Sequence, residues 1–290
     1  MAKILVTGAN GQLGSELRDI AGSFRHHIFL FEDRTGIDIT NDQDITSYFS
    51  IHAPQYCINC AAYTAVDKAE TEEEQALAVN VQAVKNLAAA CNQYGAKFIH
   101  ISTDYVFDGT ANKPYKEEDA PHPVNRYGQS KLIGEIEAQK ESNQTIILRT
   151  SWVYSVYGNN FVKTMLRLMQ SRPQINVVAD QQGSPTYAAD LAAAIMHIID
   201  SGVWVPGIYH FTNEGETTWF QFAEAIKELY SLNCTIQPIK TEQYPTPAKR
   251  PKYSVLDKEK IVRTFQIRLI PWQQSLSTCL LRLKKQKQNT

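Results

Sequence analysis

The chain has 290 residues, of which 43% are hydrophobic and 20% are charged, so it is long enough for one large core or two unequal lobes. Its formal net charge is -1, with acids and bases mixed along most of its length, which argues against a nucleic-acid or anionic-membrane partner. Residues 1–3 lead straight into an apolar run, and no apolar stretch reaches the ~20 residues of a membrane span, so we expect a cytoplasmic protein.

Short apolar runs alternate with longer segments of helical period along the first two thirds of the chain. The runs predict strands at residues 4–7, 27–31, 56–59, 97–102 and 145–148. The periodic segments predict helices near residues 12–21, 42–51, 72–93, 127–141, 161–170 and 187–199. This alternation predicts an α/β fold with a Rossmann-like doubly wound parallel sheet.

Beyond Gly202 the pattern changes, because aromatic residues, turns and prolines surround one further helix near residues 219–231. We interpret this part as a smaller C-terminal substrate-binding lobe. Residues 1–150 are expected to form mainly the dinucleotide-binding domain and residues 151–290 mainly the substrate-binding lobe, with about 187–200 returning to the first domain. The basic run at residues 282–287 is interpreted as a solvated or frayed terminus.

The cysteines and histidines give no sign of a disulfide framework or a metal centre. Five scattered cysteines are an odd number, which favours reduced and mostly buried thiols. Cys57 and Cys60 form a C-x-x-C, but within a predicted strand, which favours core thiols over a redox or zinc motif. The seven histidines show no paired spacing on a helix, so no metal site is expected.

A glycine-rich segment follows the first predicted strand and opens the first helix. Gly8, Gly11 and Gly14 have the spacing G-x-x-G-x-x-G, which allows a tight turn and a close approach of the backbone to a pyrophosphate. The second strand ends in residues 31–34, where an acid can bond a ribose diol and Arg34 can meet a 2′-phosphate. The sequence therefore predicts a dinucleotide site and leaves NADH and NADPH both open.

Two further segments belong to the same predicted site. Asp38 follows a short extended segment, where it can accept a hydrogen bond from an adenine amino group or cap the helix that begins near Asp42. Residues 59–64 follow the third strand, and their small side chains allow a cofactor to lie against the backbone.

Tyr127 and Lys131 lie four residues apart on a predicted helix, so both project from one face. We expect the Lys131 ammonium to lower the pKa of the Tyr127 phenol from about 10 toward neutrality, as an acid or base at cellular pH requires. Thr103 follows the fourth strand, where its hydroxyl can bond the same substrate oxygen. The constellation predicts hydride transfer at a carbonyl, with protonation of its oxygen.

With these motifs the chain resembles the extended short-chain dehydrogenase/reductases, and within them the dTDP-4-dehydrorhamnose reductases. The resemblance extends in family order across nearly the whole chain, and its most specific stretches are NCAAYTAVDKAE at residues 59–70 and STDYVFDG at 102–109. Further stretches are YGQSKLIGE (127–135), RTSWVY (149–154), NNFVKTMLRL (159–168), DQQGSPT (180–186) and YPTPAKRP (244–251).

The resemblance implies reduction of the C4 keto group of dTDP-4-dehydro-β-L-rhamnose to dTDP-β-L-rhamnose, an activated sugar for cell-surface polysaccharide, with NADPH or NADH. It implies that Thr103, Tyr127 and Lys131 are catalytic. The implied cofactor contacts are Gly8, Asn10, Gly11, Gln12, Leu13, Gly14, Asp38, Ile39, Ala61, Ala62, Tyr127 and Lys131. The implied substrate contacts are Thr64, Val66, Thr103, Asp104 and Trp152, although Trp152 is also a candidate core aromatic.

Two departures from the family pattern bear on assembly and packing. Some members form dimers around Mg²⁺ held by acidic side chains, one of them near the C-terminus, whereas the last dozen residues here are basic and contain no acid. We therefore expect a monomer or a metal-free homodimer. Cys60 stands where the family commonly has alanine, a small change.

Two alternative functions remain open at this point. One is a sugar-nucleotide epimerase or dehydratase of the same superfamily, and the other is a non-catalytic regulatory subunit like that of methionine adenosyltransferase. A single acid, Asp104, follows Thr103, which argues against dehydration. The presence of Thr103, Tyr127 and Lys131 argues against a purely regulatory role.

Overall fold

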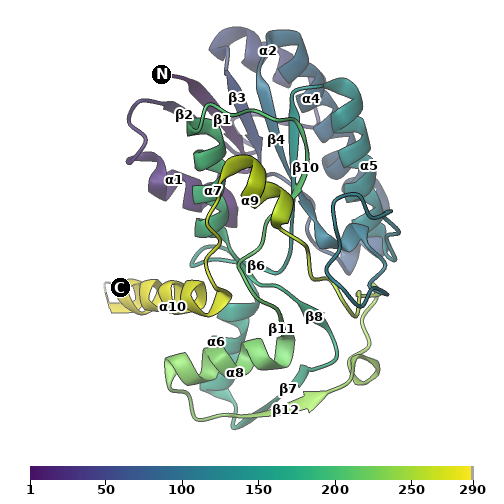
Figure 1. Ribbon diagram of the computed structural model, residues 1–290, viewed down its shortest axis with the longest axis vertical. Coiled ribbons are helices and arrows are strands. Elements are labelled where there is room, and N and C mark those ends of the chain that lie inside the picture. The colour runs from purple at the N-terminus through teal and green to yellow at the C-terminus, as the bar shows by residue number, and fades with distance from the viewer. Residues whose placement is uncertain (289–290) are drawn as a thin grey trace.

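A six-stranded parallel sheet forms the centre of the molecule in the computed structural model, which describes residues 1–288 (Figure 1). The strands lie in the order β2-β1-β3-β4-β5-β10, so the direction of winding reverses at β1. Ligands bind at such a reversal, beyond the carboxyl ends of the strands. The strand bounds are β1 (Lys3–Thr7), β2 (Ile28–Glu32), β3 (Tyr56–Asn59), β4 (Lys97–Thr103), β5 (Thr145–Thr150) and β10 (Gly207–His210).

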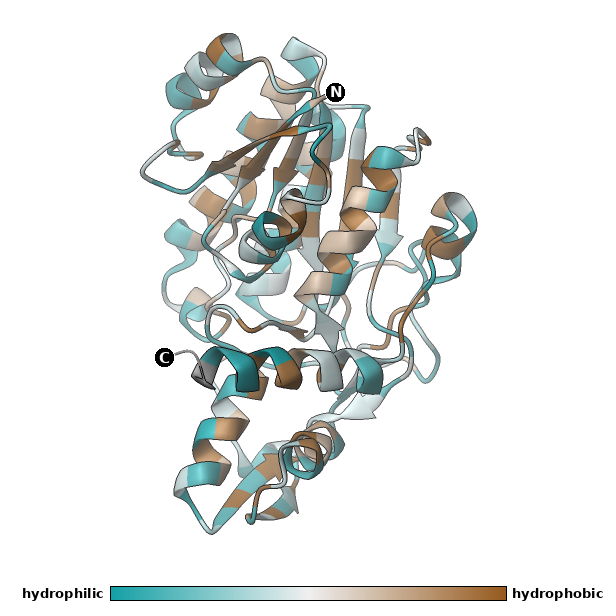
Figure 2. Cartoon of the chain, turned by 90° about the vertical axis from the view of Figure 1, so that its left-hand side faces the viewer, coloured by the Kyte–Doolittle hydropathy of each residue, from teal (hydrophilic) through white to brown (hydrophobic). Residues whose placement is uncertain are grey.

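Helices cover both faces of this sheet because its central strands are apolar on both sides. In β1, Ile4 and Val6 pack with α1, α7 and α9, while Leu5 between them packs with α2 and α4 on the opposite face. Figure 2 shows the hydrophobic residues gathered along these strands. The predicted doubly wound α/β fold is confirmed. The helix bounds are α1 (Gln12–Ala21), α2 (Asp42–His52), α4 (Ala83–Tyr94), α5 (Arg126–Glu141), α7 (Ala188–Asp200) and α9 (Glu259–Phe265).

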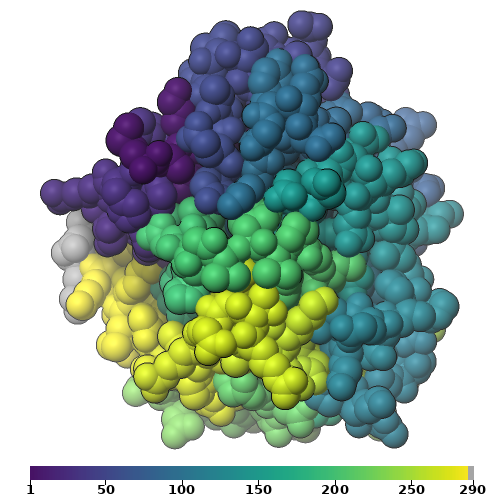
Figure 3. All heavy atoms as spheres, turned by 45° about the horizontal axis from the view of Figure 1, so that its top comes forward, coloured from purple at the N-terminus to yellow at the C-terminus, as the bar shows by residue number. Residues whose placement is uncertain are grey.

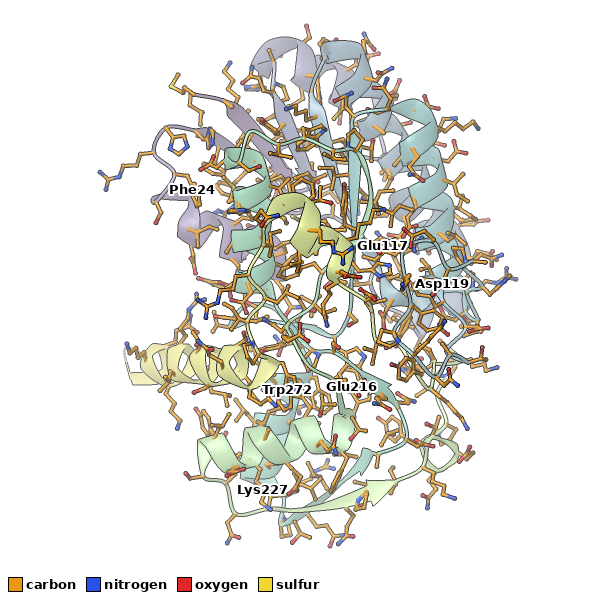
Figure 4. All side chains as sticks on the ribbon, in the orientation of Figure 1. Phe24, Glu117, Asp119, Glu216, Lys227 and Trp272 are labelled. Atoms are coloured by element: carbon orange, nitrogen blue, oxygen red, sulfur yellow. The ribbon has the colours of Figure 1, made fainter. Side chains whose placement is uncertain are left out.

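A smaller lobe with its own core lies below the sheet in Figure 1. Its helices α6 (Phe161–Ser171), α8 (Trp219–Tyr230) and α10 (Trp272–Gln288) pack beside a parallel pair, β7 (Gln174–Val178) and β12 (Thr235–Ile239). Trp272, labelled in Figure 4, starts α10 and packs edge-on against Phe222, with ring centroids 5.6 Å apart. Short strands complete the lobe: β6 (Val153–Tyr154) with β9 (Thr186–Tyr187), and β8 (Gln182–Gly183) with β11 (Thr217–Thr218).

The long helix expected near residues 72–93 is interrupted by a π-helical turn, η2 (Ala78–Gln82), between α3 (Glu73–Leu77) and α4. Within this turn the Asn80 side chain accepts a hydrogen bond from Tyr63 N at 2.9 Å and donates to Tyr63 O at 3.1 Å. The turn thus holds the loop that follows β3, a common use of π-turns near sites. The 3₁₀ turns are η1 (Lys68–Glu70), η3 (Asp104–Val106) and η4 (Thr241–Gln243).

The expectation of a frayed basic tail is wrong for Arg282, which lies within α10. Its guanidinium bonds Glu16 Oε2 at 2.7 Å and Asp19 Oδ2 at 2.6 Å, and so joins α10 to α1. Figure 3 shows the C-terminal part of the chain (yellow) and the part around residue 200 (green) against the N-terminal part (purple) on one face. No helix within residues 1–288 combines the length and apolarity needed to cross a membrane.

Candidate active site

A cleft of about 730 Å³ opens beyond the carboxyl ends of β1 and β2. Among the predicted cofactor contacts, the structure places Gly8, Asn10, Gly11, Asp38, Ile39, Ala61 and Ala62 in its lining. Gly8 has a φ of +65°, and a Cβ there would lie 2.6 Å from Ala61 N, so only glycine lets the two loops approach this closely.

Gly14 does not line this cleft, although it is a predicted cofactor contact. A Cβ on Gly14 would lie 2.5 Å from the carbonyl oxygen of Gly8. The third glycine of the motif therefore packs the start of α1 against the turn, rather than forming part of the wall.

The start of α1 is suited to a bound pyrophosphate. Gly11 is its N-cap and no side chain caps the helix, so the first-turn N–H groups are available to an anion. Gln12 reaches from this turn to the second lobe, where its Oε1 accepts a hydrogen bond from Asn160 Nδ2 at 2.9 Å. The glycine cradle and the uncapped helix fit a dinucleotide.

Asp38 forms part of the cleft wall and does not cap α2. The N-cap of α2 is Asn41, whose side chain accepts from Gln43 N, so the capping interpretation of Asp38 is wrong. The Asp38 carboxylate accepts from Thr40 Oγ1 at 2.7 Å and Thr40 N at 3.0 Å. These bonds lower its pKa and keep it ionised. Glu32, Asp33 and Arg34 line the same cleft, so it offers groups for NADH and for NADPH.

A second cleft of about 760 Å³ adjoins the first and shares Gly11, Cys60 and Ala62 with it. Besides Gly11 and Ala62, the structure brings nine further predicted residues into its lining, from separate parts of the chain. They are Gln12, Leu13, Thr64, Val66, Thr103, Asp104, Tyr127, Lys131 and Trp152.

Tyr127 lies in the first turn of α5, at the side of this cleft. Burial, together with the smaller effect of the Asp104 charge, raises the pKa of its phenol to about 12, although a side-chain hydrogen bond with Thr103 opposes the rise. The expectation that Lys131 lowers this pKa toward neutrality is therefore wrong for the protein without bound cofactor, because desolvation outweighs the favourable contacts. At neutral pH Tyr127 is a phenol, the form that donates a proton.

Lys131 lies one turn further along α5 and is only 1% exposed. Its Nζ donates to Ile101 O at 2.7 Å and lies 3.2 Å from His100 Nε2. Burial lowers the pKa of Lys131 to about 8, and Glu135 opposes the shift. The hydrogen bonds of Lys131 Nζ are thus made to residues of β4 and not to the Tyr127 phenol.

Trp152 is a half-buried residue of the second cleft with a strained backbone. Its φ is +48°, a left-handed conformation that costs about 1–3 kcal/mol for a non-glycine residue. Its ring stacks on Trp219 with centroids 3.5 Å apart. Trp152 therefore contributes both to packing and to the cleft wall, where Trp219 is its partner.

Sequence reasoning missed a third cleft, of about 700 Å³, in the second lobe. It shares Tyr105, Phe161 and Trp219 with the second cleft, and both Arg172 and Arg250 line it. No local spacing joins these residues, because they come from separate elements that only the fold brings together. The sequence signal for this cleft was that Tyr105, Phe161 and Arg250 lie within stretches that match the family pattern.

The thiols and histidines lie mostly outside these clefts. All five cysteines are free, and four of them are buried. Within the described part of the chain, one group, His26, His27 and Asp200, brings three possible metal ligands within 4.8 Å. Ala2 N donates to His27 Nδ1, which leaves the proton on Nε2 to bond Asp200 at 2.6 Å. This geometry is that of a hydrogen-bonded cluster.

The doubly wound sheet, the glycine cradle and the Thr103, Tyr127 and Lys131 cleft define a nicotinamide-dependent oxidoreductase of the extended short-chain class. The family described as RmlD substrate binding domain matches residues 2–285. The chain is 44% identical to dTDP-4-dehydrorhamnose reductase of Aggregatibacter actinomycetemcomitans, over 95% of this chain and 97% of that protein. The chain belongs to the family of dTDP-4-dehydrorhamnose reductases.

Solved structures agree with this assignment. The crystal structure of a dTDP-4-dehydrorhamnose reductase from Clostridium acetobutylicum has a TM-score of 0.92 and 40% identity, covering 97% of this chain and 99% of that one. The enzyme from Bacillus anthracis, in complex with NADP, has a TM-score of 0.93 and 39% identity at the same coverage.

Proposed function

We propose that the chain reduces the C4 keto group of dTDP-4-dehydro-β-L-rhamnose to dTDP-β-L-rhamnose, with NADPH or NADH as the reductant. The observation that carries the proposal is the position of Thr103, Tyr127 and Lys131 in a cleft that adjoins the dinucleotide cleft. A carbonyl bound there meets a proton donor beside the nicotinamide site.

Each residue has a distinct role in this proposal. The bound nicotinamide supplies the hydride to the carbonyl carbon. Tyr127, which its raised pKa keeps protonated, gives its proton to the carbonyl oxygen. Thr103 donates a hydrogen bond to the same oxygen and Lys131 holds the nicotinamide ribose. The backbone around Gly8 and Gly11 binds the pyrophosphate.

The third cleft supports a sugar-nucleotide substrate. We assign it to the nucleotide part, because aromatic rings there can stack on a base while Arg172 and Arg250 can pair with phosphate. Tyr105, Phe161 and Trp219 line both this cleft and the one that holds Tyr127. The sugar then lies beside Thr64, Val66, Asp104 and Trp152.

The proposal also covers assembly and location. We expect a monomer or a metal-free homodimer, because the described end of α10 is basic, and we expect the enzyme to work in the cytoplasm.

The alternative of an epimerase differs in its use of the cofactor, since an epimerase restores its nicotinamide and consumes none.

The test is a Tyr127→Phe variant, assayed by loss of the absorbance of the reduced nicotinamide with dTDP-4-dehydrorhamnose made in the same tube. Removal of the hydroxyl should lower turnover at least ~10²-fold and leave nucleotide binding near wild type. Tyr94→Phe, on α4 away from all three clefts, is the matched control. Wild-type turnover in Tyr127→Phe would refute the role of the phenol, and no nicotinamide consumption by the wild type would refute the reductase.

A further inference from the structure

A chain of buried polar side chains runs beneath the cleft from β1 to Lys131. Thr7 Oγ1 donates to Asn59 Oδ1 at 2.7 Å, Asn59 Nδ2 lies 3.2 Å from His100 Nδ1, and His100 Nε2 lies 3.2 Å from Lys131 Nζ. The first three residues are opposite one another on adjacent strands and are fully buried. Each polar atom here depends on its protein partner, so the direction of each hydrogen bond can be deduced.

The orientation of the Asn59 amide is fixed by the backbone. Ala61 N lies 3.1 Å from Asn59 Oδ1, and a backbone N–H can only donate, so the oxygen must face it. The Nδ2 group therefore faces His100, and it too can only donate. His100 Nδ1 must then be the unprotonated acceptor.

The proton of His100 is consequently on Nε2. Burial and Lys131 hold the pKa of His100 well below its usual range, so the ring is neutral and carries a single proton. Turning the ring over would put carbon atoms at both contacts and lose both bonds. The Nε2–H thus points at Lys131 Nζ, and it needs a lone pair there. An ammonium has none, whereas a neutral amine has one.

We propose that His100 is a positioning residue that holds Lys131 as a neutral amine in the nucleotide-free protein at mildly alkaline pH, and that Lys131 takes up one proton when the dinucleotide binds at that pH. The proton comes from solvent and adds to the Nζ lone pair, with no other covalent bond made or broken. The resulting ammonium can no longer accept from His100, so its hydrogens become available to the ribose hydroxyls. The second step rests on the proposed function, since it assumes that Lys131 holds this ribose.

The charges around Lys131 are consistent with a neutral amine. Glu135 raises the pKa of Lys131, but its carboxylate is already neutralised by Arg149, with bonds of 2.7 and 2.9 Å. Burial prevails and lowers the pKa of Lys131 to about 8, so the neutral amine is the main form above that pH. The other titratable groups that line its cleft are Cys60, Asp104, Tyr105 and Tyr127. A bound polyanion adds the charge that favours the ammonium.

The first test is the tautomer of His100 in the free protein, read by nitrogen NMR on histidine-labelled chain one unit above the Lys131 pKa of about 8. The His100 signals are those that disappear in a His100→Gln variant. We expect the Nε2–H tautomer, and the Nδ1–H tautomer would overturn the proposal, because Lys131 would then be the donor. This measurement involves no ligand and no turnover, so it stands whether or not the proposed function holds.

The second test is proton uptake, from calorimetric titration of NADPH in two buffers that differ in ionisation enthalpy. One unit above the Lys131 pKa of about 8, the wild type should take up ~1 proton per nucleotide bound. His100→Gln can turn its amide oxygen toward an ammonium, so its uptake should fall below ~half of that. His197→Gln on α7, whose ring bonds Phe265 O, is the control and should match the wild type.

Tight binding of NADPH by the wild type without proton uptake would overturn the second step, as would equal uptake in His100→Gln. Absence of NADPH binding would contradict the proposed function instead. The tautomer of His100 in the free protein would still show whether Lys131 is a neutral amine or an ammonium.

Discussion

Asp104 is the most strongly perturbed carboxyl in the reaction cleft. It is 2% exposed, and its Oδ2 has no hydrogen-bond partner among the described residues. Burial raises its pKa to about 7, and hydrogen bonds from Ser254 and Thr103 only partly oppose the rise. Ionisation of Asp104 near neutral pH therefore costs folding free energy.

The sign of the resulting pH dependence follows from the direction of the shift. The folded protein holds the Asp104 proton up to a pH of about 7, whereas the unfolded chain releases it near 3.8, so stability from this group is lost as the pH rises through that window. Asp104→Asn cannot ionise. Relative to wild type it should gain stability as the pH rises from about 4 to about 7, by at most about 4 kcal/mol, measured by urea unfolding. A difference independent of pH would contradict this.

The sequence predicted which residues line the reaction cleft, but it did not predict their burial or their backbone conformation. Thr103, Tyr127 and Lys131 stood out because their spacing is a motif, and the structure gathers them in one cleft. The depth of the cleft was not visible in the sequence, so the Tyr127 pKa was predicted in the wrong direction. The strained backbone of Trp152 was also hidden, because it depends on Trp219 from a distant helix.

Gly14 in the first βα turn and Gly22 at the end of α1 allow a matched test of how closely this turn is packed. Alanine normally stabilises a helix over glycine by about 1 kcal/mol, but a Cβ on Gly14 would lie 2.5 Å from Gly8 O. Gly14→Ala should therefore weaken NADPH binding by at least ~10-fold, since the turn must open. Gly22→Ala, where the added Cβ meets nothing within 4 Å, is the matched control. Equal affinity of the two variants, measured by calorimetry, would show that the turn tolerates the shift.

At the level of elements, apolar runs and periodic segments were predicted well, whereas irregular segments were not. The predicted β3 coincides with residues 56–59, because a short apolar run between turns has few alternatives. The π-turn η2 was missed, since Asn80 has no local signature and is held by Tyr63 and Ser130. Helix α10 was not predicted, because the basic run at its end interrupts the pattern of its apolar face. Leu276, Leu280 and Leu283 have the helical spacing and are buried in the core of the second lobe.

Hydrogen bonds between the two lobes fix the position of one lobe relative to the other, and so the shape of the clefts between them. Gln12 of α1 bonds Asn160 at the start of α6, and Arg282 of α10 bonds Glu16 of α1. The dinucleotide cleft lies against the sheet, and the third cleft lies in the second lobe. The alternation of strands and helices predicted five of the six strands of this sheet from sequence, but not β10. The third cleft is built from separate elements, and its sequence signal was limited to motif stretches around Tyr105, Phe161 and Arg250. The division at residue 150 stays a prediction.

The basic end of α10 leads to a prediction about assembly. A metal-bridged dimer needs carboxylates at the interface, and the last dozen residues contain none. The mass measured by sedimentation should therefore be the same with excess Mg²⁺ and with a chelator. A dimer that dissociates on chelation would contradict the metal-free assembly.

The central claim is hydride transfer to the sugar C4, and transfer of deuterium tests it most directly. The protein is mixed with dTDP-4-dehydrorhamnose and NADPH deuterated on the face of the nicotinamide that reacts, with each face tried in turn, and the product is analysed by mass spectrometry and NMR. We predict that, with one of the two labels, deuterium appears at C4 of dTDP-rhamnose, one atom for each nicotinamide oxidised. Sugar that is epimerised or dehydrated with no net oxidation of nicotinamide, or oxidation that leaves C4 unlabelled with both labels, would contradict the account.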